Sequence, residues 1–145
     1  MKHQDSKLSA ILGYKSDIIF LSDVRFNGKD HMICDKLKLW YDVHHNSSKN
    51  NRGVAVLFSK QVQYEIVSSA TDPQENILML RIKIRNVEFV IGAIYGPNLD
   101  NNCLEFFNFV SNTLNEWANL PIILGGDWNA TSVPSLLMKI LTCYL

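Results

Sequence analysis

Apolar residues recur along this chain with two different periods, one typical of helices and one typical of strands. Apolar positions three or four residues apart predict helices over 7–14, 29–39 and 103–117. Short apolar runs and alternating segments predict strands, because successive side chains of a strand point to opposite faces. The expected strands cover 17–21, 40–44, 53–58, 62–67, 76–84, 87–95 and 120–124. Several strands with helices before and after them indicate an α/β layered domain with a mixed sheet.

The apolar faces of the predicted helices identify candidates for the core. In 29–39 we expect Ile33 and Leu37 to face inward, with Met32 as a third candidate. Asn101 or Asn102 can cap the last helix. The apolar stripe expected on that helix comprises Leu104, Phe107, Val110 or Ser111, Leu114 and Trp117.

One pair of strands is predicted to form a hairpin. Apolar and charged residues alternate over 76–84, which is typical of a strand with one face in solvent. A turn at Arg85-Asn86 then leads into the apolar segment 87–95. We therefore expect these two strands to pair antiparallel.

The composition narrows the class of protein. The 145 residues fit one domain, and 47% hydrophobic with 19% charged residues excludes a chain that is disordered by composition. The net charge of zero gives no basic signature of nucleic-acid binding, although a local basic patch can suffice. Three scattered cysteines argue for a reducing compartment and against a disulfide framework. With no signal-like start and no run long enough to cross a bilayer, we expect a soluble intracellular protein with no membrane partner.

The most informative motif follows the last predicted strand. Gly125-Gly126 ends an apolar run, and Asp127 and Asn129 come directly after it. If the backbone stays extended, these two side chains point to the same side of the sheet. A carboxylate can orient and deprotonate water, and a carboxamide can hold a phosphate oxygen without adding negative charge. The alternative is an ordinary strand-end turn, because Gly, Asp and Asn are common turn residues.

Three further segments precede this motif, and their order along the chain is informative. They are an apolar strand that ends in an acid at 17–25, a small-residue strand start at 52–58, and a strand ending in Tyr95 before a Gly-Pro-Asn turn at 90–98. In this order the four segments resemble the exonuclease-endonuclease-phosphatase superfamily. The amino-acid sequence of 94–98 and 125–129 is most similar to the endonuclease domain of LINE-type (non-LTR) retrotransposons. The resemblance covers about residues 15 to 131.

The resemblance implies a fold and a set of site residues. The fold would be a layered sandwich of two mixed β-sheets flanked by helices. Asp23 stands where the family places a metal-binding Glu, and implies a site for Mg²⁺ or Mn²⁺; otherwise it is an exposed strand-end acid. Tyr95 would lie near the scissile phosphate, or serve only as a half-buried aromatic. Asp127 would orient the attacking water, Asn129 would hold the phosphate, and Trp128 would pack in the core between them.

The chain also departs from the family pattern. The family uses an Asn in a first strand and a His in a late Ser-Asp-His motif, and neither is present. We read the four histidines here as surface or structural residues. We therefore expect an incomplete copy of the fold, truncated at both ends, with a partial domain over 1–131 and an aberrant apolar tail over 132–145.

The implied function is Mg²⁺-dependent nicking of DNA by a fragment of a retrotransposon endonuclease that is weak or inactive as given. DNA is the implied partner, and a reverse transcriptase domain in the parent polyprotein is another. Two alternatives remain open. One is a phosphatase or RNA nuclease of the same superfamily, and the other is a relic or binding module without catalysis.

Overall fold

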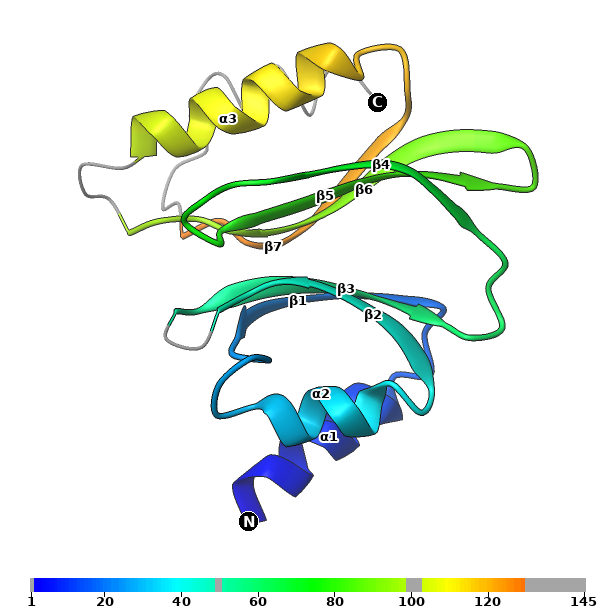
Figure 1. Cartoon of the computed structure of the whole chain (residues 1–145), viewed down its shortest axis with the longest axis vertical. Helices are drawn as coiled ribbons and strands as arrows, with labels where there is room; N and C mark the ends of the chain where they lie inside the picture. Colours follow the sequence, from blue (N-terminus) through cyan, green and yellow to red (C-terminus); the bar gives the residue numbers. More distant parts are fainter. Residues whose placement is uncertain (1, 49–50, 99–102, 130–145) are drawn as a thin grey trace.

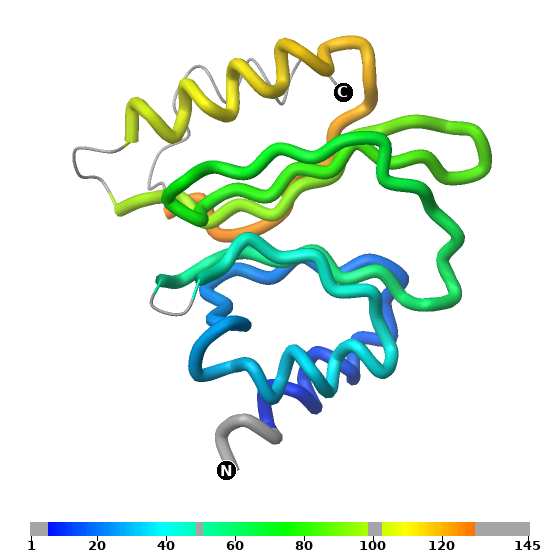
Figure 2. The backbone as a smooth tube through the Cα atoms, viewed as in Figure 1, coloured from blue at the N-terminus to red at the C-terminus, as the bar shows by residue number. Residues whose placement is uncertain are grey.

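Two β-sheets are stacked face to face, and helices cover the outer face of each (Figure 1). The computed structural model describes residues 2–48, 51–98 and 103–129. The first part of the chain builds one sheet with its two helices, and the following part builds the other sheet with its helix (Figure 2). This α/β sandwich confirms the fold that the resemblance implies.

The first sheet has three strands, β1 (Ile18–Val24), β2 (Tyr41–Asn46) and β3 (Gly53–Ser59). Their order is β1-β3-β2, with β3 antiparallel to both neighbours. β3 is buried along six consecutive residues, which explains its unbroken apolar sequence. The helices α1 (Lys2–Gly13) and α2 (His31–Leu37) lie on the outer face of this sheet (Figure 1).

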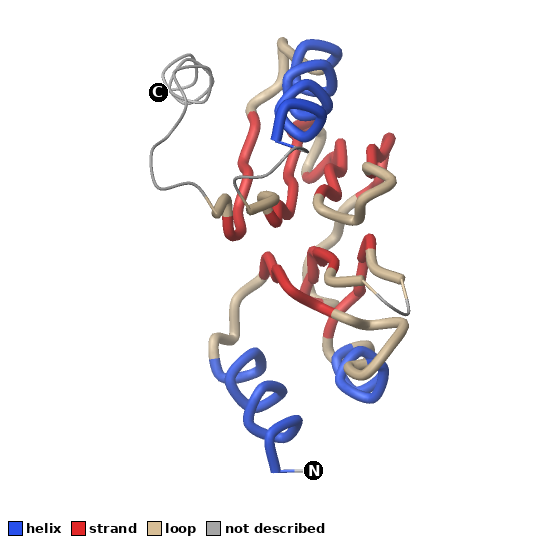
Figure 3. The backbone as a smooth tube through the Cα atoms, turned by 90° about the vertical axis from the view of Figure 1, so that its left-hand side faces the viewer, coloured by secondary structure: helices blue, strands red, loops and turns tan. Residues whose placement is uncertain are grey.

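The second sheet has four strands, β4 (Glu65–Thr71), β5 (Ile77–Ile84), β6 (Val87–Tyr95) and β7 (Ile122–Asp127), in that order. β5 and β6 form the predicted hairpin. Arg85 and Asn86 both have positive φ, the signature of a two-residue turn that matches the twist of the strands. β7 pairs parallel to β6 after the helix α3 (Cys103–Glu116). Figure 3 shows α3 outside the second sheet.

The core has three layers. Between the sheets lie apolar residues of β3, β5 and β6, among them Val56, Phe58 and Leu80. A second cluster joins the first sheet to its helices, and a third joins the second sheet to α3 through Phe106, Val110 and Leu114. Burial on both sides of each sheet fixes the register of the strands, because a slip by one residue would expose the apolar face.

Some details differ from the sequence predictions. Leu104 is 72% exposed and Met32 is 52% exposed, so neither is a core residue. On α3 the inward position is taken by Phe106, from which Val110, Thr113 and Trp117 follow at helical spacing, and this rotation turns Leu104 outward. The strand expected at 62–67 begins later, as β4, because pairing with β5 determines its span. The boundary at 131 and the tail 132–145 lie outside the described residues.

None of the described helices is long and apolar enough to span a membrane.

Candidate functional site

Four strand ends meet at one edge of the sandwich. In the first sheet, Val24 at the end of β1 pairs with Gly53 at the start of β3. In the second sheet, Tyr95 at the end of β6 pairs with Asp127 at the end of β7. β1 contacts both β6 and β7 across the sandwich. The motifs around Asp23 and Asp127, which lie 104 residues apart in the sequence, are therefore brought to the same edge.

Asp23 is presented at this edge by an irregularity of β1. The register of β1 against β3 shifts between Ser22 and Val24, and Asp23 has a φ of 56°. A bulge of this kind turns one side chain away from the regular ladder, and Asp tolerates the left-handed backbone better than most residues. The Asp23 side chain is half exposed as a result.

Arg52 lies between Asp23 and Tyr95, and the sequence analysis did not select it. Its Nε is 3.4 Å from Asp23 Oδ1, and its Nη1 donates a hydrogen bond of 3.1 Å to the Tyr95 hydroxyl. The hydrogen bond to Tyr95, followed by the charge of Asp23, raises the pKa of Arg52. Its position in the sequence is the signal that could have identified Arg52. It directly precedes β3, and the start of β3 must lie beside the end of β1 because the two strands are antiparallel.

Asp127 and Asn129 hold one another in a tight turn. The Asn129 backbone N–H donates to Asp127 Oδ1 at 2.9 Å, and the Asn129 side-chain amide donates to the Gly96 carbonyl at 2.6 Å. Gly96 in turn donates its N–H to the Asp127 carbonyl at 2.6 Å. Within the described residues, the other carboxylate oxygen of Asp127 has no partner, so it is available to a water molecule.

Trp128 points away from this group. It is half-buried and packs against the cluster below α3, with its ring edge-on to Phe106 at 6.4 Å between centroids. It anchors the turn, because its side chain is held on one side of the chain while Asp127 is exposed on the other.

The residues at this edge fit a divalent cation only as a single-carboxylate site. The described residues contain no group of three or more His, Cys, Asp or Glu placed to hold a metal ion. Mg²⁺ is commonly held by only one or two carboxylates, with waters and substrate phosphates as the other ligands. Asp23 can supply one such oxygen, provided that the Arg52 guanidinium gives way.

His31, His44 and His45 have structural partners. In β2 the adjacent His44 and His45 face opposite sides, as expected for a strand. The His44 Nε2 is 2.7 Å from the Tyr64 hydroxyl, while His45 lies edge-on to Phe26. Burial lowers the pKa of both imidazoles. His31, His44 and His45 make no hydrogen bond to Asp23, Tyr95 or Asp127.

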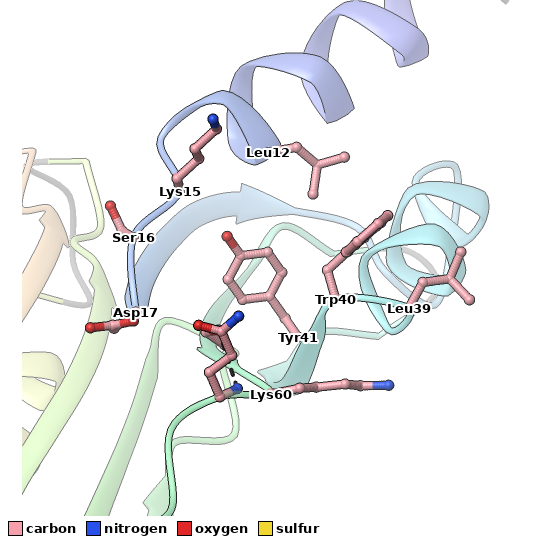
Figure 4. Close-up of a pocket in the computed structure, with 10 residues that line it drawn as sticks. Leu12, Lys15, Ser16, Asp17, Leu39, Trp40, Tyr41 and Lys60 are labelled. Carbon is pink, nitrogen blue, oxygen red and sulfur yellow. Dashed lines mark hydrogen bonds between the residues drawn. The ribbon is translucent and has the colours of Figure 1, made fainter.

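Two cavities flank the first sheet. One of about 270 Å³ opens beside Asp23, between α1 and β1. The other, of about 520 Å³, lies at the opposite end of the same sheet, where Trp40, Tyr41 and Lys15 line it (Figure 4). The larger cavity contains none of the residues of the strand-end site, because β1 runs from one end of the sheet to the other between them.

Comparison with known proteins identifies the fold. No family model matches the sequence, and no curated protein matches it. Among solved structures, the human Nocturnin catalytic domain with bound sulfate aligns with a TM-score of 0.72 and 17% identity over 97% of this chain and 61% of that chain. An endonuclease/exonuclease/phosphatase from Bacteroides vulgatus gives 0.72 and 13% identity, covering 96% and 62%.

A third match is D. rerio TDP2 in complex with a single-strand DNA product, with a TM-score of 0.68 and 14% identity over 94% of this chain and 56% of that one. The chain thus spans less than two thirds of the length of these structures. At such low identity the likeness concerns architecture. The chain has the fold of the endonuclease/exonuclease/phosphatase proteins.

Proposed function

We propose that this strand-end site handles a phosphodiester, and that the chain is part of a metal-dependent hydrolase that nicks DNA. The observation that carries the proposal is the pairing of Tyr95 with Asp127, joined through Arg52 to Asp23. A phenol, a carboxylate with a free oxygen, a carboxamide and a second carboxylate are thereby gathered at one exposed edge. The DNA product bound to D. rerio TDP2, a protein of the same fold, supports DNA as the substrate.

Each side chain has a distinct task in this proposal. Asp127 accepts a hydrogen bond from water and takes its proton as the water attacks. The Tyr95 hydroxyl donates to a phosphate oxygen as negative charge develops there. The turn that Asn129 closes on Gly96 fixes Asp127 in place. The Asn129 amide has two N–H donors, and the one that does not bond to Gly96 would donate to a phosphate oxygen. Asp23 would hold the divalent cation, which when bound supplies neutralisation of phosphate charge.

The more specific assignment to a LINE-type retrotransposon endonuclease rests on the amino-acid sequence of 94–98 and 125–129. We expect slow turnover, since His31, His44 and His45 hydrogen-bond elsewhere and not to Asp23, Tyr95 or Asp127. A phosphatase or an RNA nuclease could use the same edge. Phosphomonoester and RNA substrates assayed in parallel with DNA would separate these activities.

The test is nicking of supercoiled plasmid with Mg²⁺ or Mn²⁺, with and without a chelator. Asp127→Ala removes the group that orients water, and Asp35→Ala removes an exposed acid on α2 as the matched control. We expect the wild type and the Asp35→Ala control to nick the plasmid weakly, in a reaction that the chelator stops. The Asp127→Ala variant should show no nicking. Cleavage that never exceeds the Asp127→Ala background, with either metal, would refute the hydrolase.

One observation favours a second candidate, a binding module that has lost catalysis. The Asp23 carboxylate already has a cationic partner in Arg52. A chain that binds DNA equally well with and without metal, and cleaves under neither condition, would fit this alternative.

A further inference from the structure

We propose that the larger of the two cavities beside the first sheet binds a nucleotide, with its base stacked on the Trp40 indole and its phosphate held by the ammonium groups of Lys15 and Lys60. The cavity has a volume of about 520 Å³. Small-molecule sites usually have volumes of about 300–1,000 Å³. None of the residues of the strand-end site lines this cavity, so the inference stands independently of the proposed hydrolase.

Trp40 presents a large aromatic surface to solvent from a backbone that is fixed on both sides. It is 60% exposed, whereas the other two tryptophans pack in the cluster beside α3. Its N–H donates to the Leu37 carbonyl at 2.9 Å, and its carbonyl accepts a hydrogen bond from the Lys60 N–H at 3.1 Å. An indole held in this way suits a nucleobase, because every base has a flat face that can stack on an aromatic side chain.

Large apolar side chains are exposed beside this indole. Leu39 lines the same cavity and is 68% exposed, and the still more exposed Tyr14 directly precedes Lys15. The Tyr41 ring, in contrast, is buried and stands in the middle of the cavity lining (Figure 4). Neighbouring exposed apolar residues of this kind mark surfaces that bind a ligand or a partner.

Lys15 and Lys60 supply positive charge to the cavity, one from the end of α1 and the other from the end of β3 (Figure 4). Both are exposed, and neither forms an ion pair with a described carboxylate. Asp17 also lines the cavity, but Figure 4 shows its carboxylate on the far side of Tyr41 from Trp40 and Lys60. The lining beside Trp40 is thus positive, and a lysine ammonium binds phosphate as a point charge.

The register of the first sheet explains why Trp40 and Lys60 lie together. Tyr41 at the start of β2 pairs with Ser59 at the end of β3, and the hydrogen bond from Lys60 to Trp40 continues this antiparallel ladder by one residue. Gln61 comes next, and its backbone N–H donates to the Ser59 hydroxyl at 3.3 Å. Its side-chain amide has no hydrogen-bond partner among the described residues. A carboxamide offers donors and an acceptor, as the edge of a nucleobase requires.

The combination of these groups selects the class of ligand. An exposed indole alone would suit any flat apolar ring, and two lysines alone would suit any anion. One cavity that offers both, with an unpaired carboxamide beside them, matches a base joined to a phosphate. This chemistry is shared by a free nucleotide and by a nucleotide within a single strand.

The experiment measures the binding of AMP to the whole chain by isothermal titration calorimetry. From the usual strength of base stacking we expect Trp40→Leu to weaken binding about tenfold, and Trp40→Phe, which keeps an aromatic ring, to retain most of the affinity. Lys60→Gln should weaken binding about two- to fivefold at low salt and less at high salt. Lys83→Gln removes a lysine of β5 in the other sheet and, as the matched control, should bind as the wild type does. Thermal unfolding of each variant shows that the comparison is made on folded protein.

Further probes separate the parts and the source of the ligand. Adenosine lacks the phosphate and ribose 5-phosphate lacks the base, so each should bind more weakly than AMP. A short fluorescent oligodeoxyadenylate, followed by anisotropy, tests a base presented within a strand. Binding of the oligonucleotide that is tighter than that of AMP and is lost in Trp40→Leu would assign the cavity to single strands, whereas Trp40-dependent binding of AMP alone would assign it to free nucleotides.

Three results would overturn the nucleotide site. They are equal affinity of the wild type and Trp40→Leu for both AMP and the oligonucleotide, absence of binding of either probe to the wild type at millimolar concentration, and binding of ribose 5-phosphate as tight as that of AMP. The plasmid-nicking assay tests the proposed function separately, because Asp127 does not line this cavity.

Discussion

Replacing Gly126 by alanine should destabilise the protein strongly, because β7 passes this point in a backbone conformation that only glycine adopts easily. Gly126 has a φ of 138°, and a Cβ built on it would overlap the carbonyl oxygen of Ile94. Ile94 is its register partner on β6, so the carbonyl cannot retreat without breaking the parallel pairing. Strain of this kind costs about 1–3 kcal/mol, and the steric overlap adds a similar amount, which gives a loss of about 3 kcal/mol.

This loss is large beside a typical stability of about 5–15 kcal/mol. For a chain of this size it should lower Tm by about 6–12 °C. The assay is urea and thermal unfolding followed by circular dichroism. Gly13→Ala is the matched control, since a Cβ at the end of α1 meets nothing within 4 Å. We expect this control to differ from the wild type by less than about 0.5 kcal/mol. If Gly126→Ala unfolds at the wild-type midpoint, the close approach of β7 to β6 is wrong, and with it the adjacency of Tyr95 and Asp127.

Three further predictions concern stability. Burial lowers the pKa of His44 and His45 in the folded protein. The free energy of unfolding should therefore be highest above their ordinary pKa of 6.5 and should fall as the pH drops toward the lower pKa values of the folded state. Urea midpoints measured between about pH 8 and pH 5 should show this fall, and the double variant with glutamine at both positions should show less of it. Leu114→Ala empties a site under α3 and should cost about 2–5 kcal/mol in the same titration, whereas a cost below 1 kcal/mol would contradict the packing of α3. The Asn46 amide donates to the Ile77 carbonyl at 2.9 Å and so links the two sheets; Asn46→Ala should cost about 1–3 kcal/mol, and unchanged unfolding would show that this link is not needed.

The order and type of the elements could be predicted because local signals are strong in this chain. The hairpin at Arg85-Asn86 follows from alternation and a turn, and β3 follows from a continuous apolar run. The rotation of α3 could not be predicted as well. Phe106 and Leu104 are both apolar and two residues apart, so they lie on nearly opposite sides of a helix, and only the position of the sheet decides which of them is buried. The stacking of the two sheets came from resemblance, since periodicity says nothing about which faces meet.

In the candidate site, too, local contacts could be predicted more readily than contacts between residues far apart in the sequence. The contact between Asp127 and Asn129 is local, but it is not the extended pair that the spacing predicts. β7 ends at Asp127, Asn129 has a φ of 48°, and its backbone N–H donates to the Asp127 carboxylate, as in the alternative of a strand-end turn. Their neighbour Tyr95 was selected by its motif, and the parallel pairing of β6 with β7 explains why that motif matters. Arg52 escaped selection because its partners are 29 residues before it and 43 residues after it, as the residue numbers of Asp23 and Tyr95 give. Contacts at such separations depend on strand register across two sheets.

The backbone also explains why an aspartate can stand where the family has a glutamate. Position 23 has a φ of 56° at a bulge, a conformation in which Asp is enriched and which longer side chains adopt less readily. The bulge turns the side chain outward, to a point where a short carboxylate already reaches the Arg52 guanidinium. Shortening the side chain therefore does not by itself remove the carboxylate from the strand-end site. Within the described residues this carboxylate is paired with Arg52, which stands at the start of the 52–58 segment and to which the resemblance assigns no role.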